Sequence, residues 1–133
     1  MRSGPSWART GFLLVVWLFV AGTLVQVFLA GLGVFAGGAN FAAHRDFGYT
    51  LGLVPIALVV LALVGRLPRS LVLGSALLFG LLILQSVFVA FRSTAPALAA
   101  LHPVNAFFIV LTGIWLGWQG RRFAGPPLGN ATG

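Results

Sequence analysis

Four long apolar intervals, separated by one or two charged residues, divide this chain. Charged residues are absent from residues 10–44, 47–65, 70–91 and 93–120. Each interval has room for the roughly 20 apolar residues with which a helix crosses a bilayer. The pattern therefore predicts four spanning helices, at about residues 11–36, 42–64, 70–91 and 96–119.

Only short connections join these intervals, and short connections are typical of antiparallel helix neighbours. We therefore expect an all-α integral membrane protein, an up-down-up-down four-helix bundle over residues 11–119. Pro96 suits the first turn of the fourth helix, and Pro55 and Pro103 predict kinks in the second and fourth helices. Residues 1–10 form an N-terminal segment, and the Gly/Pro-rich residues 120–133 are expected to be a disordered tail.

Two pairs of glycines have the spacing that lets membrane helices approach closely. Gly48 and Gly52 lie in the second predicted helix, and Gly113 and Gly117 lie in the fourth. The same small residues would also leave room for a flat ligand, so the sequence leaves both interpretations open.

The composition agrees with a membrane protein. Only 7% of the residues are charged, against about 25% in a soluble domain. All eight basic residues are arginines that flank the apolar runs, whereas a nucleic-acid site would gather them on one polar face. Cysteine is absent, which excludes disulfides, iron–sulfur clusters and thiolate metal sites.

The arginines predict the orientation of the bundle. Six of them fall on one side of the predicted membrane, namely Arg2, Arg9, Arg66, Arg69, Arg121 and Arg122. Arg45 and Arg92 fall on the other side. Because basic residues concentrate in cytoplasmic segments, we expect both termini in the cytoplasm. A chain rich in arginine, alanine and glycine and free of lysine is typical of a GC-rich bacterium, which predicts a multi-pass protein of the bacterial cytoplasmic (inner) membrane.

Five bulky polar residues inside the predicted spans lie in the outer half of the bundle or near its midplane. They are Gln26, His44, Gln85, His102 and Asn105. Polar groups inside a membrane face the bundle interior and pair there. The sequence therefore predicts a polar pocket in the outer half.

The spacing of these residues reveals an internal repeat. Gln26 precedes His44 by 18 residues, and Gln85 precedes His102 by 17. Each half is a helix with a glutamine, a short outer loop and a second helix that opens with a histidine. Two such hairpins of the same direction are related by an axis along the membrane normal, which places the two histidines opposite each other.

Two opposed histidines are the ligand set of a bis-histidine haem, whose closed iron transfers electrons without activating oxygen. We therefore predict His44 and His102 as axial ligands of haem b. Arg45 and Arg92 are candidates for the propionates, and the alternative is that both histidines are ordinary interfacial residues. The hydrogen-bond partners of the ligands are expected to be Gln26, Gln85 and Asn105.

Several short motifs resemble one half-unit of the haem A synthases and related small four-helix bacterial membrane proteins. They are His44-Arg45 with Gly48, Leu84-Gln85, Pro96 and Ala100-Leu101-His102 with Ala106. The resemblance covers roughly residues 12–119 and implies a haem-binding fold with the histidine pair at the outer side. The chain has one half-unit and lacks the outer-loop acid of that family, so haem A synthase activity is not expected. A homodimer would supply a second half.

The leading prediction is a small haem-carrying membrane protein that exchanges electrons with a quinol or a redox protein. A cofactor-free accessory subunit of a larger membrane complex is the alternative. Transport is disfavoured because no charged residue lies deep in a span. One acid and no cysteine leave few groups for hydrolytic catalysis, so the sequence disfavours a hydrolase and leaves open whether the protein is an enzyme.

Overall fold

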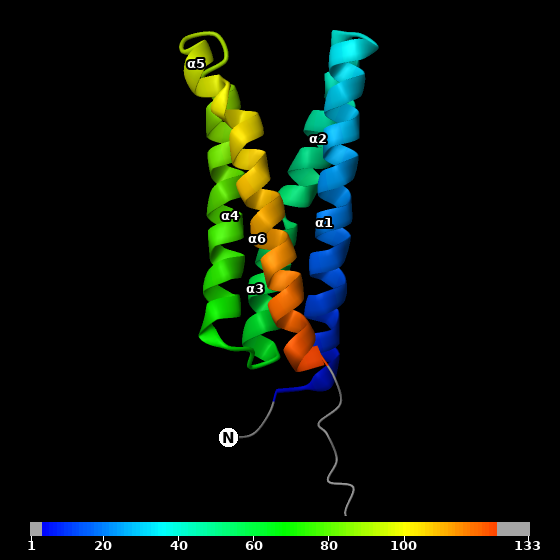
Figure 1. Cartoon of the computed structure of the whole chain (residues 1–133), viewed down its shortest axis with the longest axis vertical. Coiled ribbons are helices and arrows are strands. Elements are labelled where there is room, and N and C mark those ends of the chain that lie inside the picture. The colour runs from blue at the N-terminus through cyan, green and yellow to red at the C-terminus, as the bar shows by residue number, and fades with distance from the viewer. Residues whose placement is uncertain (1–3, 125–133) are drawn as a thin grey trace, which may run out of the picture.

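The structure is a computed structural model that describes residues 4–124. Within these residues all regular structure is helical (Figure 1). The elements are α1 (Ser6–Phe35), η1 (Gly38–Asn40), α2 (Phe41–Gly52), α3 (Val54–Val64), α4 (Arg69–Ala90), α5 (Pro96–Ala99) and α6 (Leu101–Ala124). Four segments are long and apolar enough to cross a membrane: α1, η1 to α3, α4, and α5 with α6. The chain is therefore a multi-pass membrane protein built from four helices.

The first and last helices are each longer than predicted. α1 begins at Ser6 and α6 ends at Ala124, so five residues of the predicted tail are helical. Contacts between the two ends explain the extension, because Gly120 packs against the ring of Phe12 and the guanidinium of Arg121 lies 4.9 Å from the centre of a Trp17 ring. Residues 125–133 of the predicted tail lie outside the described residues.

Prolines interrupt the second and fourth helices, as predicted. Leu53 separates α2 from α3, and Pro55 is the second residue of α3. Ala100 separates α5 from α6, and Pro103 lies in the first turn of α6. A proline lacks the N–H that would continue the helical ladder and disfavours a helical conformation in the preceding residue. Pro96 opens α5, as expected for a first-turn proline.

The two ends of the bundle differ in what they contain (Figure 1). The start of α1, the link between α3 and α4 and the end of α6 lie at one end, which we call the proximal end. η1 and α5 lie at the other, distal end. The first hairpin, formed by α1 with α2 and α3, and the second hairpin, formed by α4 with α5 and α6, diverge toward the distal end.

The buried hydrophobic core lies in the proximal half and near the middle of the bundle. Its largest side chains with almost no exposure are Phe12, Phe19, Leu58, Leu71, Leu78 and Leu116. Within the described residues, no hydrophobic side chain between Thr23 and Leu51, or between Leu78 and Ile109, is buried. These two segments form the distal halves of the two hairpins.

Seen along the bundle axis, the four helical segments lie at the corners of a square. α1 packs against α6 and against α2 and α3, and α4 packs against α6 and α3. α2 and α6 lie on a diagonal, because no Cα of one comes within 8 Å of a Cα of the other. Side chains that α2 and α6 direct inward therefore meet inside the bundle.

The glycine pair in α6 allows the close helix approach that the sequence indicated. A Cβ added at Gly117 would lie 2.8 Å from the Trp17 ring, and one at Gly113 would lie 3.0 Å from Val20. The pair in α2 behaves differently. A Cβ at Gly48 would meet the amide nitrogen of Gln26 at 2.6 Å, and Gly52 has nothing within 4 Å.

Candidate functional site

Each histidine of the predicted pair is held by a backbone carbonyl of the helix before it. Nδ1 of His44 lies 3.1 Å from the carbonyl oxygen of Gln26, and Nδ1 of His102 lies 3.1 Å from that of Gln85. A carbonyl oxygen only accepts hydrogen bonds, so each Nδ1 carries the proton and donates it. Nε2 of each neutral ring then keeps the lone pair that can ligate a metal.

The two imidazole rings meet inside the distal half of the bundle. Their centres are 6.2 Å apart and their planes are inclined by 66°. An imidazole nitrogen lies about 2 Å from a first-row metal ion that it ligates, and the ring centre lies about 1 Å further away. Two imidazoles on opposite sides of one ion therefore hold their centres roughly 6 Å apart. The observed separation matches that of a bis-imidazole metal site.

The second hairpin contains an amide pair beside His102. Asn105, only 4% exposed, lies one turn along α6. Its Nδ2 donates to the carbonyl of Leu81 at 2.8 Å and to Oε1 of the partly buried Gln85 at 2.6 Å. The role that the sequence assigned to Gln85 and Asn105 stays a prediction. Their mutual bond and the Leu81 carbonyl have no sequence signal, since they depend on how α4 and α6 pack.

The first hairpin has no such amide pair. Phe47 and Gly48 follow His44 where Asn105 and Ala106 follow His102. The amide nitrogen of Gln26 lies over Gly48, and Oε1 of Gln26 is buried without a hydrogen-bond partner among the described residues. The ring of Phe41 instead contacts the His44 ring edge to face, with centres 6.3 Å apart. Phe41 was not singled out from the sequence, although its place three residues before His44 puts it on the same helix face.

The repeat inferred from the histidines extends through the whole core. Residues separated by 59 positions are buried together in the first helix of each hairpin: Ala8 and Leu67, Phe12 and Leu71, Val16 and Ser75, Phe19 and Leu78. Residues separated by 58 positions are buried together in the second: Leu51 and Ile109, Pro55 and Gly113, Leu58 and Leu116, Ala62 and Gly120. The two hairpins therefore use equivalent faces, and the equivalence of His44 and His102 belongs to this larger pattern.

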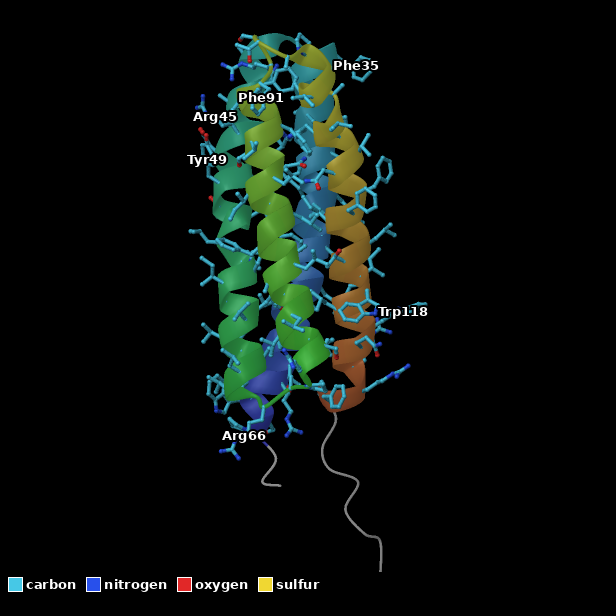
Figure 2. All side chains as sticks on the ribbon, turned by 90° about the vertical axis from the view of Figure 1, so that its left-hand side faces the viewer. Phe35, Arg45, Tyr49, Arg66, Phe91 and Trp118 are labelled. Carbon is cyan, nitrogen blue, oxygen red and sulfur yellow. The ribbon has the colours of Figure 1, made fainter. Side chains whose placement is uncertain are left out.

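The predicted propionate arginines lie at the surface. Arg45 is 60% exposed and its Nε donates to the Asp46 carboxylate at 2.8 Å. Figure 2 shows Arg45 and Tyr49 directed away from the bundle. Arg92 is exposed in the turn that follows α4. The structure thus brings the five polar residues together, whereas Arg45 points elsewhere.

The two imidazole rings are the side chains of this site that could hold a metal ion or a cofactor. Across residues 4–124 no group of three or more histidine, cysteine, aspartate or glutamate side chains is placed to hold a metal ion. Two histidines suit an iron whose four remaining ligands come from a macrocycle. Two shallow apolar grooves, of about 470 and 260 Å³, lie within the second and first hairpins respectively, and neither is lined by a histidine.

Fold and site together define a class: a four-helix membrane protein of two repeated hairpins with a histidine pair between them. The chain belongs to the family of unknown function DUF6220, whose model matches residues 26–95. The matched segment includes Gln26, His44 and Gln85 and ends before His102. No curated protein and no solved structure matches the chain.

Proposed function

We propose that this protein is a small cytochrome-like membrane protein that holds haem b between His44 and His102. The observation that carries the proposal is the 6.2 Å separation of the two ring centres, with both Nδ1 atoms already bonded to carbonyls. Each Nε2 is then free to bind iron, and each ring is oriented by a partner of the kind that metal-ligating histidines normally have.

Haem with two histidine ligands accepts and gives up one electron at an iron with no open position. The surrounding residues orient the two histidines and shape the site around them. The carbonyls of Gln26 and Gln85 orient the rings and make them better ligands. Asn105 and Gln85 would place polar groups near the haem, and the ring of Phe41 contacts that of His44 edge to face. Arg45 and Arg92 stay our candidates for the propionates, which requires Arg45 to leave Asp46.

The proposal includes an orientation and partners. Arginines at the proximal end favour a cytoplasmic location for that end and for both termini, in an up-down-up-down bundle of a bacterial inner membrane. The haem then lies near the outer face. A quinol in the bilayer or a redox protein outside it would exchange electrons with the haem.

The decisive experiment is a reduced-minus-oxidised absorption spectrum of the protein purified after haem-replete expression. We expect the sharp α-band and Soret band of a six-coordinate, bis-histidine haem b. The double variant His44→Asn with His102→Asn should show neither band. Asparagine places an amide N–H where Nδ1 was, so it keeps a donor toward the carbonyl while removing the ligand. A wild-type protein that contains no haem after haem-replete expression would contradict the proposal.

The histidine–carbonyl bonds also favour a second candidate function. Each bond ties the two helices of one hairpin without any ligand, as a cofactor-free accessory subunit would need. Under this alternative, the protein should co-purify with stoichiometric partners from native membranes and carry no chromophore. The Asn variants would then retain both the fold and the partners.

A further inference from the structure

We infer that the two ligands are unequal: His102 anchors the haem, and His44 is the exchangeable ligand. The site would then bind a small diatomic ligand, such as carbon monoxide or nitric oxide, at the position that His44 vacates. This inference rests on the proposed function and deepens it, because it assigns a ligand class to the same site.

The second hairpin has more hydrogen bonds between its helices beside the histidine. His102 donates to the carbonyl of Gln85, and Asn105, one turn along the same helix, donates to the Leu81 carbonyl and the Gln85 side chain. Removing one partner of such a bond leaves the other unsatisfied. Moving the first turn of α6 to withdraw His102 would therefore also disturb the two bonds of Asn105.

The first hairpin holds its histidine through one bond. His44 donates to the carbonyl of Gln26, and the positions equivalent to Asn105 and Ala106 are Phe47 and Gly48. The side-chain oxygen of Gln26 is left without a partner among the described residues. Moving the start of α2 to withdraw His44 thus disturbs one hydrogen bond to the preceding helix, against three at the start of α6.

The helices that carry the two histidines also differ in continuity. α2 has 12 residues and ends beside Leu53, and Pro55 cannot donate the N–H that would join α2 to α3. α6 runs for 24 residues from Leu101 to the proximal end, where Gly113 and Gly117 pack tightly on α1. α2 has one buried residue, Leu51, next to the break at Leu53, whereas α6 has six buried residues along its length. Tilting α2 at Leu53 would therefore disturb the core less than moving α6.

Ligand exchange at this site would balance. The bond between iron and Nε2 of His44 would break, and a bond from the carbon of carbon monoxide would replace it. The His44 imidazole would keep its lone pair, and no electron or proton would be transferred. His102 would continue to hold the haem.

The test compares single variants of the haem-replete protein by their haem-to-protein ratio and by carbon monoxide binding after dithionite reduction. We expect His44→Asn to retain several times more haem than His102→Asn and to bind carbon monoxide at once. The wild-type protein should bind it more slowly, because His44 must first leave. Equal haem retention in the two variants, or greater retention in His102→Asn, would overturn the inference and leave the proposed function standing.

A second readout needs no haem. Hydrogen–deuterium exchange of the purified protein without haem should be at least ten times faster in α2 than in the first three turns of α6. Asn105→Leu, which removes the two hydrogen bonds of Asn105, should bring the two rates closer together. Equal exchange in the unsubstituted protein would contradict the inference, and absence of haem from the wild-type protein would overturn it together with the proposed function.

Discussion

The proximal and distal halves of this bundle are built on different principles. The proximal half is packed: Phe12, Leu58, Leu71 and Leu116 have no exposed surface, and Gly117 admits the Trp17 ring. In the distal half the two hairpins diverge (Figure 1). A side chain that is buried there is polar, namely that of Asn105. The buried hydrophobic side chains therefore stabilise the proximal end, and the distal end has no comparable hydrophobic core among the described residues.

This division has a physical reason in a membrane. Lipid tails are as apolar as leucine, so helices associate through close packing and polar contacts between them. The proximal half uses close packing, with small residues against aromatic rings. The distal half uses amide and imidazole contacts, among them those of Asn105, His44 and His102. Variants that act on one half and spare the other test the comparison.

The largest loss of stability is expected from creating a cavity in the packed proximal half. Phe12→Ala removes a side chain with no exposure and should destabilise the bundle by ~3 kcal/mol, because the cavity it leaves cannot collapse. The matched control on the same helix is Phe28→Ala, since Phe28 is 64% exposed in the distal half. Equilibrium unfolding in mixed micelles, followed by far-UV circular dichroism, compares the two. Similar losses in both variants would contradict a core confined to the proximal half.

Sequence patterns were sufficient to predict the four helices and the position of the polar residues in the distal half. Both depend only on where residues of each kind stand along the chain. Apolar length fixes the spans, and Pro55 and Pro103 mark the interruptions of their helices. The end of α6 was predicted at residue 119 because Arg121 and Arg122 look like a boundary. The contact of Arg121 with Trp17, a residue from the other end of the chain, carries the helix on to Ala124.

The candidate site was predicted in composition and only partly in geometry. The spacings of Gln26 with His44 and of Gln85 with His102 led to the repeat, since equal spacing in equivalent hairpins gives equal depth. The sequence named Gln26, Gln85 and Asn105 as candidate histidine partners without fixing which of their atoms would accept the bond. In the structure the backbone carbonyls of Gln26 and Gln85 are the partners, and Asn105 bonds to Leu81 and Gln85. Which atom of a residue meets a histidine depends on how the two helices pack.

A smaller effect is expected from filling glycine positions in α4. A Cβ at Gly74 would lie 2.5 Å from the Trp115 ring and 2.9 Å from Leu116, so Gly74→Ala should cost ~1–3 kcal/mol through overpacking. Six residues further along, Gly80 has nothing within 4 Å. Gly80→Ala should be neutral or stabilising by up to ~1 kcal/mol, because alanine favours the helix. The same unfolding assay checks both, and destabilisation by Gly80→Ala would show packing beyond the proximal half.

The smallest expected effect separates the two hairpins within the distal half. Gln85→Leu removes the acceptor at 2.6 Å from Asn105 and should cost about 1 kcal/mol, as typical hydrogen bonds between membrane helices contribute. Gln26→Leu removes a buried oxygen that has no partner among the described residues. It should therefore leave stability unchanged or raise it slightly, since an unsatisfied polar group is itself a cost. The free energy of unfolding of the two variants, measured before haem is added, makes the comparison. Both variants keep the backbone carbonyl that accepts the hydrogen bond of each histidine. A larger loss in Gln26→Leu than in Gln85→Leu would mean that the first hairpin, and not the second, holds the distal half together.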